Sequence, residues 1–267
     1  TVWHGSPHKF DKFDSSKIGT GEGAQAYGHG LYLAEAPSVA KSYADTLSQY
    51  HIGTRDGVKS GGDFADALVA NAGDYPASLS SAIRSQANKV ATDLANGKTA
   101  EQVIASMRSG PYARMYSGLA DAVEKMSPTK AGGSLYKVDL PDDQIAKMLD
   151  WDKPLSQQSN EVQKALTALK DENGYDALQS LKTGYGANFQ GATGQDILRA
   201  LERNTSVTNG RPEVASSFLK KQGIPGIRYL DGGSRGAGAG SSNFVVFPGN
   251  ENLLQILERN GKGLLAK

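Results

Sequence analysis

The chain has 267 residues, and its 29 Lys and Arg against 28 Asp and Glu leave a formal net charge of +1. This balance excludes a global electrostatic attraction to nucleic acid or to an anionic membrane. The absence of cysteine excludes disulfides, thiolate zinc sites and cysteine nucleophiles. No apolar run reaches the roughly 20 residues of a membrane-spanning helix. We therefore expect a soluble protein with no membrane partner, and the start at Thr1 suggests a piece of a longer chain.

The first fifty residues predict a strand, a glycine-rich loop, a second short strand and a helix. Thr1–Trp3 favours a strand that ends in a turn at HGSP. The following loop, DSSKIGTGEGAQAYGHG, contains five glycines, which tolerate backbone conformations that other residues resist. Pro37 suits the first turn of a helix, and apolar residues recur at helical spacing behind it. Exposed backbone and a polar ring at the end of the first strand suit a flat polar ligand.

A large helical insertion is predicted from about residue 54 to residue 132. Asp63 to Met126 is rich in Ala and other good helix formers, and Thr99 with Gln102 forms a capping-box signature. The segment GSLYKVDLP then alternates as a strand and stops at a proline.

Helices also dominate the segment from about residue 155 to residue 222, between predicted core strands. Thr193 with Asp196 forms an imperfect capping box at the start of one of them. The helices expected after the GSLYKVDLP strand are Gln144–Leu149, Ser156–Lys170, Thr193–Arg203 and Glu213–Lys221. The chain then returns to strand in GIPGIRYLD and in NFVVFP, whereas NLLQILERNG is compatible with a closing strand or a helical turn.

Strands at both ends and helices between them predict an α+β fold. We expect a single domain over residues 1–267, whose small sheet is assembled from distant segments. Taken singly, the polar and aromatic candidates also have structural interpretations. His4 alone is typical of a satisfied structural histidine, Tyr32 of a buried strand aromatic and Tyr43 of a helix core.

Taken together, these residues resemble a known enzyme class. HGS after a strand, the run GHGLYLA from Gly28 to Ala34, and a tyrosine eleven residues after Tyr32, at Tyr43, resemble the diphtheria-toxin and poly(ADP-ribose) polymerase class of ADP-ribosyltransferases. That class carries a His-Tyr-Glu triad, and the closest equivalent of its third motif is NFVVF, beginning at Asn243. The loop GTGEGAQAYG is similar to loops in ADP-ribosyltransferase domains of bacterial and phage polyvalent proteins. The resemblance implies a split antiparallel sheet built from both chain ends.

The resemblance also implies NAD as co-substrate and a role for each matching residue. His4 would hydrogen-bond the adenosine ribose, Gly5 would offer its backbone to the carboxamide of nicotinamide, and Ser6 would support that carboxamide. Tyr32 and Tyr43 would supply stacking faces for the nicotinamide ring, where aromatic stacking contributes about 0.5–1.5 kcal/mol beyond burial.

Asn243 departs from the family pattern, because the class usually has glutamate there. An amide can hydrogen-bond a ribose hydroxyl, but it supplies neither a base nor a negative charge. Three outcomes stay open. Another carboxylate substitutes, with Glu22 in the glycine-rich loop favoured and Glu251 next; the enzyme transfers a single ADP-ribose to an acceptor that needs little activation; or the domain binds NAD without turning it over.

Other polar residues carry no clear assignment. Arg235 suits a phosphate or the protein target, although a solvated loop arginine is favoured, and Arg228 is equally ambiguous. Asp231 is interpreted as the end of its strand. No metal is expected, and three histidines without metal-ligand spacing are interpreted as surface residues: His8, His29 and His51.

We therefore expect a mono-ADP-ribosyltransferase that uses NAD to modify a macromolecular acceptor, as a toxin or effector domain acting in the cytoplasm of a host or target cell. A protein acceptor is favoured over a nucleic acid, and the helical insertion is the expected place for its contacts. The alternatives are a catalytically inactive module that binds NAD or ADP-ribose, and an NAD glycohydrolase.

Overall fold

The computed structural model describes residues 1–18, 25–48, 51–167, 169–170, 174, 176–204, 208, 210–233 and 240–264. Glu22 and Arg235 lie outside the described residues. The chain divides into two compact units. Unit 1 comprises Thr1–His4, Phe10–Ala40 and Leu135–Lys267, and unit 2 comprises Gly5–Lys9 and Lys41–Ser134. The predicted insertion of residues 54–132 lies within unit 2.

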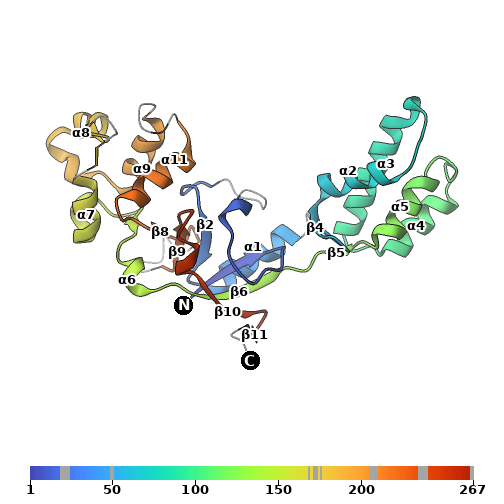
Figure 1. Cartoon of the computed structure of the whole chain (residues 1–267), viewed down its shortest axis with the longest axis horizontal. Helices are drawn as coiled ribbons and strands as arrows, with labels where there is room; N and C mark the ends of the chain where they lie inside the picture. Colours follow the sequence, from blue (N-terminus) through green and yellow to red (C-terminus); the bar gives the residue numbers. More distant parts are fainter. Residues whose placement is uncertain are drawn as a thin grey trace. The chain divides into compact units, whose positions relative to one another are not determined.

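An eight-stranded sheet forms the centre of unit 1, in the order β11-β10-β6-β1-β2-β9-β8-β7. Its strands are β1 (Val2–Ser6), β2 (Leu31–Ala34), β6 (Ser134–Asp139), β7 (Leu149–Asp150), β8 (Gly226–Leu230), β9 (Ser242–Val246), β10 (Gln255–Arg259) and β11 (Lys262–Gly263). Figure 1 shows the early strand β2 beside the late strand β9, and the two pair antiparallel. The sheet therefore joins both chain ends, as the sequence predicts.

The sheet differs in two respects from the small split antiparallel sheet that was predicted. The sheet has eight strands, and β7 pairs with β8 in parallel. β7 consists of only Leu149–Asp150, and a strand of two residues is too short to be predicted from hydrophobic periodicity. The predicted helix Gln144–Leu149 accordingly ends early, because α6 covers only Asp142–Ile145.

Two clusters of buried side chains pack against opposite faces of this sheet. Strand β9 shows the division, because Val245 belongs to one cluster and its neighbours Phe244 and Val246 belong to the other. The cluster with Val245, here called the helix-side core, is completed by side chains from the later helices of unit 1. Those helices are α7 (Asn160–Thr167), α8 (Gln179–Tyr185), α9 (Gly194–Arg203) and α11 (Pro212–Lys221). The cluster with Phe244, here called the opposite core, includes Val2, Tyr136 and Val138.

Unit 2 is built mainly from consecutive helices. They surround an apolar core that includes Phe64, Leu68 and Leu94, each with no exposed surface. The helices are α2 (Gly61–Asn71), α3 (Ser80–Ala95), α4 (Ala100–Ser109) and α5 (Ser117–Met126), and they are accompanied by a small antiparallel sheet of β3 (His51–Thr54), β4 (Gly57–Ser60) and β5 (Thr129–Lys130). Helix α1 (Pro37–Ser48) spans the division between the units. The capping box of Thr99 and Gln102 is confirmed, with both reciprocal hydrogen bonds present.

Some local predictions differ from the structure. The HGS segment predicted as a turn continues strand β1 through Ser6, because pairing within a sheet outweighs local turn propensity. His51, predicted at the surface, is only 5 % exposed, and its Nδ1 lies 2.6 Å from the carbonyl oxygen of Leu47. The NLLQILERNG segment contains both predicted alternatives in succession, a 3-10 turn over Glu251–Leu253 and then strand β10. The predicted helix Ser156–Lys170 is replaced by a 3-10 turn over Leu155–Gln157 and the shorter helix α7.

Candidate functional site

His4 lies half-buried on strand β1, among aromatic rings. Its Nδ1 is 2.8 Å from the carbonyl oxygen of Tyr32, and its ring centroid is 5.2 Å from that of Phe13 and 5.9 Å from that of Phe10. Burial lowers the pKa of His4 below the ordinary value of 6.5, and the hydrogen bond to Tyr32 opposes this only in part. A neutral ring beside a carbonyl must carry its proton on Nδ1, so Nε2 is left as a hydrogen-bond acceptor.

Strands β1 and β2 pair over a short length next to His4. Within the described residues, their ladder consists of the single register pair Trp3–Ala34. The imidazole donates to the carbonyl of Tyr32, two residues before Ala34 on β2. In a longer β1–β2 ladder, a backbone N–H of β1 would donate to this carbonyl instead. His4 therefore holds the first half of β2, where the described strands show no backbone pairing with β1.

Tyr32 anchors the end of the glycine-rich loop. Its hydroxyl donates to the carbonyl of Gly28 at 2.8 Å and accepts the backbone N–H of Tyr27 at 3.2 Å. Gly28 has φ of +107°, which side chains rarely adopt, and a Cβ on Gly30 would come within 2.5 Å of the Val246 carbonyl oxygen. The two glycines of the GHG motif are thus required by backbone geometry beside Tyr32.

Aromatic and cationic side chains hold the same loop segment on the helix-side core. The Tyr27 ring stacks on that of Tyr229 with centroids 3.8 Å apart, and it meets the Trp151 ring edge-on at 4.9 Å. Arg199 of α9 donates to the carbonyl of Ala26 at 2.7 Å. The entry to β2 is therefore fixed by contacts from α9, β8 and the segment after β7.

The side chains of His4 and Tyr32 project to opposite faces of the sheet. His4 contacts the opposite core through Phe13 and Tyr136, whereas Tyr32 packs against the helix-side core. Only the backbone carbonyl of Tyr32 meets the imidazole. The structure thus brings the two motif strands together without placing the two side chains on one face.

Asn243 shares the face of Tyr32. It pairs in register with Ala34 on one side and with Tyr229 on the other, and it is only 4 % exposed. Its Nδ2 is 3.4 Å from Oδ1 of Asp231. Within the described part of the chain, its Oδ1 is buried without a hydrogen-bond partner. Buried polar atoms are normally satisfied in folded proteins, so this acceptor calls for an explanation.

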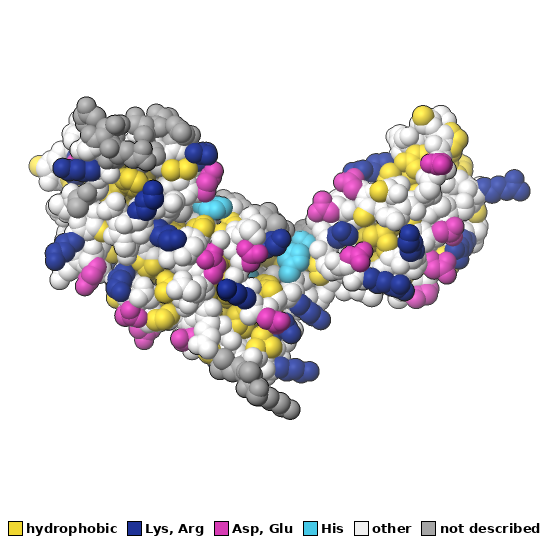
Figure 2. Space-filling model, in the orientation of Figure 1, with side chains coloured by type: hydrophobic (Ala, Val, Ile, Leu, Met, Phe, Trp, Pro, Cys, Tyr) yellow, Lys and Arg dark blue, Asp and Glu magenta, His cyan; other side chains and the backbone are white. Residues whose placement is uncertain are grey.

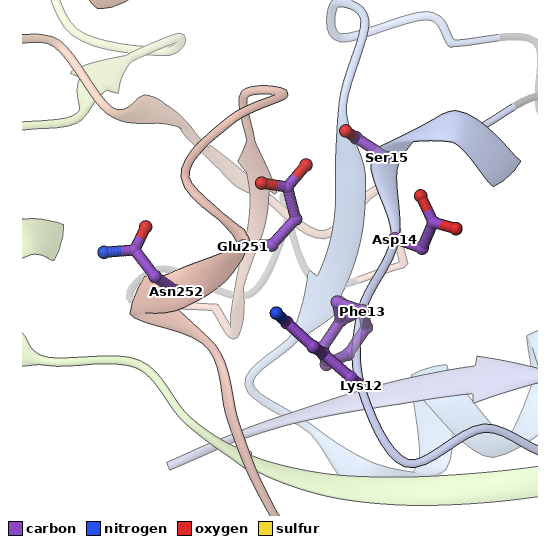
Figure 3. A pocket seen from close by; sticks show the side chains of 6 residues that line it. All are labelled: Lys12, Phe13, Asp14, Ser15, Glu251 and Asn252. Carbon is purple, nitrogen blue, oxygen red and sulfur yellow. The ribbon is translucent and has the colours of Figure 1, made fainter.

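Glu251, the second candidate for a substitute acid, belongs to a different group of residues. It lines a pocket of about 620 Å³ together with Lys12 and Ser15. Figure 3 shows Ser15 across from Glu251. Burial raises the pKa of Glu251, but hydrogen bonds from Ser15 and from the N–H of Gly249 outweigh this effect and hold the pKa below its usual range. These contacts do not include Tyr32 or Asn243.

The remaining candidates lie in unit 2. Gly5 and Ser6 end strand β1, and the Ser6 hydroxyl accepts the backbone N–H of His8 at 3.1 Å. Tyr43 on α1 is 57 % exposed, so the interpretation of this ring as helix core is wrong. An exposed aromatic ring on a helix is available for stacking, and the predicted contact with nicotinamide stays a prediction.

The sequence predicted no role for Asp231 beyond the end of its strand. Asp231 follows β8, and its carboxylate lies beside Asn243 although twelve residues separate them in the chain. Only the register of β8 against β9 reveals this proximity. Arg228, by contrast, donates from Nε to the Ser242 hydroxyl at 3.0 Å.

The distribution of surface charge does not single out one unit of the protein. On the face drawn in Figure 2, basic and acidic side chains are interspersed over each unit.

Within the described ranges, no group of three or more His, Asp or Glu side chains could hold a metal ion. No helix in the described part of the chain combines the length and apolar character needed to cross a membrane. No protein-family model, curated protein or solved structure matches the chain significantly.

Proposed function

We propose that the chain is a mono-ADP-ribosyltransferase with the corresponding fold, using NAD as co-substrate to modify a macromolecular acceptor. One observation carries the proposal. His4, Tyr32 and Asn243 occupy the motif positions of the ADP-ribosyltransferase class, and they lie on β1, β2 and β9, which are consecutive strands of the sheet. Residues more than 200 positions apart in the chain thereby lie on neighbouring strands.

The hydrogen-bonding character of two of these residues fits NAD. Nε2 of a neutral His4 and Oδ1 of Asn243 are both acceptors, and ribose hydroxyls are donors. The two acceptors lie on opposite faces of the sheet, so an NAD molecule that lies against one face contacts only one of them. Following the resemblance, we assign the nicotinamide ribose to Asn243, and the contact of His4 with the adenosine ribose stays a prediction.

The reaction breaks the bond between the nicotinamide nitrogen and the ribose carbon. The electron pair leaves with nicotinamide, which departs as a neutral molecule and so needs no general acid. An oxocarbenium-like carbon remains, as in glycoside chemistry. A nucleophile of the acceptor bonds to this carbon and releases its proton to solvent. Asn243 contributes hydrogen bonding to the ribose and no proton transfer.

Nicotinamide release from NAD tests the proposal. The full chain is incubated with NAD in the presence and in the absence of a cell lysate, and released nicotinamide is quantified. Release that requires lysate and accompanies labelling of an acceptor is expected. Release without lysate would instead indicate a glycohydrolase, and no release under either condition would indicate a binding module.

Two variants separate the site from general stability. Asn243→Leu keeps the side-chain size but removes the carbonyl and the NH₂ of the amide. We therefore expect release to fall about 10²–10³-fold, the usual cost of losing one preorganised polar group from a reaction centre. Ser216→Ala is the matched control, because its hydroxyl on α11 is also buried without a partner among the described residues. This control should release nicotinamide at the wild-type rate.

A further inference from the structure

Asp231 lies directly after β8, on the same face of the sheet as Asn243. Tyr229 pairs in register with Asn243, and Asp231 is two residues beyond Tyr229, which places it on the same face. Two backbone interactions fix its position. Its N–H donates to the carbonyl of Ser241 at 2.9 Å, and its Oδ2 accepts the N–H of Gly233 at 3.1 Å. The other oxygen, Oδ1, lies 3.4 Å from Nδ2 of Asn243.

This contact determines which way the Asn243 amide points. A carboxylate only accepts hydrogen bonds, so the amide must turn its NH₂ group toward Asp231. Its oxygen therefore points away from Asp231. That oxygen is the buried acceptor without a partner in the described chain, and it suits a ligand hydroxyl.

Neighbouring carboxylates do not share this role. Oδ2 of Asp152 accepts the backbone N–H of Leu230 at 2.7 Å. Oε2 of Glu35 accepts the backbone N–H of Ser242, also at 2.7 Å. Each of these acids is thus bonded to the backbone of a strand end, whereas Asp231 meets the Asn243 side chain.

Resting on the proposed function, we propose that Asp231 is a positioning residue for ADP-ribose transfer. It orients the Asn243 amide so that Oδ1 accepts a hydroxyl of the nicotinamide ribose, and its charge polarises that amide. The Asp231 carboxylate thereby makes Oδ1 of Asn243 more negative, and this oxygen stabilises the oxocarbenium-like carbon of the ribose as it forms. The pair Asp231–Asn243 supplies together the hydrogen bond and the charge that the single glutamate of the related class supplies alone.

The steady-state kinetics of nicotinamide release test this role in the full chain. Asp231→Asn removes the charge and allows either end of the Asn243 amide to face it. Because the charge acts mainly on the transition state, we expect kcat to fall about 10- to 100-fold with KM changed less than about threefold. Asp231→Glu should restore part of kcat, which loss of a merely structural contact would not predict. Asp152→Asn is the matched control and should stay within about threefold of wild type.

The outcomes distinguish this inference from the proposed function. If the wild-type chain releases nicotinamide and Asp231→Asn retains its kcat, the role of Asp231 is wrong and the function stands. An equal loss of kcat in Asp152→Asn would also contradict it, because any acid near the end of β8 would then suffice. If the wild-type chain releases no nicotinamide with or without lysate, the proposed function fails and the role of Asp231 fails with it.

Discussion

The two units are stabilised in different ways. In unit 2, helices that follow one another in the chain pack around an apolar core, and exposed ion pairs such as Arg108 with Asp121 lie on the surface. In unit 1, strands from both chain ends pair in one sheet, and Tyr27, Tyr32 and Tyr229 carry polar groups into the helix-side core. The Tyr32 hydroxyl is hydrogen-bonded, whereas the buried Asn243 amide oxygen has no partner among the described residues and therefore costs stability. This cost in the core of unit 1 accords with the role proposed for Asn243.

The largest effect that separates the units is expected from Leu68→Ala in unit 2. Leu68 has no exposed surface, so the truncation leaves a cavity and should lower the free energy of unfolding by about 2–5 kcal/mol. At a temperature where the variant stays folded, nicotinamide release should match wild type. Chemical denaturation and the release assay on the same sample check both points. A loss of release as large as that of Asn243→Leu would break the comparison.

Tyr32 is expected to affect ligand and loop separately. Tyr32→Ala removes a stacking face and should weaken NAD binding by about 1–3 kcal/mol, or about ten- to a hundredfold. Tyr32→Phe keeps the ring but loses the hydrogen bonds to Gly28 and Tyr27, so it should lower stability by about 1–3 kcal/mol with NAD affinity within about twofold. Calorimetric titration and thermal melting measure the two effects. Equal affinities of the two variants would remove the stacking role.

Tyr43 offers a cleaner test, because its ring is exposed. Tyr43→Ala should leave the free energy of unfolding within about 0.5 kcal/mol of wild type. If the ring stacks on nicotinamide, NAD affinity should fall by about 0.5–1.5 kcal/mol, which is roughly two- to tenfold. Tyr112→Ala in unit 2 is the control, since this tyrosine is similarly exposed at 62 %. Titration with NAD decides, and unchanged affinity in both variants excludes Tyr43 from the site.

Acid should weaken both units through different histidines. Burial lowers the folded-state pKa of His4 below 6.5. Below about pH 6.5, the imidazole is therefore protonated in the unfolded chain but stays neutral in the folded chain. This contribution to stability is complete above that pH and is lost as the pH falls. His8 in unit 2 behaves alike, with its pKa lowered by burial and by the nearby His51.

Melting temperatures at about pH 7.5 and about pH 5.5 check this smallest expected effect. His4→Asn preserves a donor for the Tyr32 carbonyl but does not titrate, so its melting temperature should fall less than that of wild type. The same comparison for His8→Asn assigns the remainder to unit 2. A wild-type melting temperature that rises on acidification would contradict the sign for both residues.

Sequence alone predicted what local patterns encode. The capping residues Thr99 and Thr193, the strand after Pro225 and the alanine-rich helices all follow from near neighbours. The two-residue strand β7 could not be predicted, because its pairing with β8 joins Leu149 to Ile227, which is distant in the chain. For the same reason the pattern gave Asp231 no role, since only strand register brings it to Asn243.

The candidate site shows the same division. The sequence predicted that the loop glycines adopt backbone conformations that other residues resist, and the φ of +107° at Gly28 of the GHG motif confirms this. The close approach of Gly30 to Val246 was not predicted, because it depends on pairing with the distant strand β9. The motif did not predict that His4 and Tyr32 would face opposite sides, which follows from the register pair Trp3–Ala34. Motif reading therefore identified the strands of the site better than the directions of their side chains.

Mass spectrometry of acceptor proteins after incubation with NAD, lysate and the full chain tests the central claim most directly. An acceptor is expected to gain a single ADP-ribose unit with wild type and with Ser216→Ala, and this gain should be about 10²–10³-fold slower with Asn243→Leu. Consumption of NAD that yields only free ADP-ribose, or an acceptor modified equally by wild type and Asn243→Leu, would contradict it.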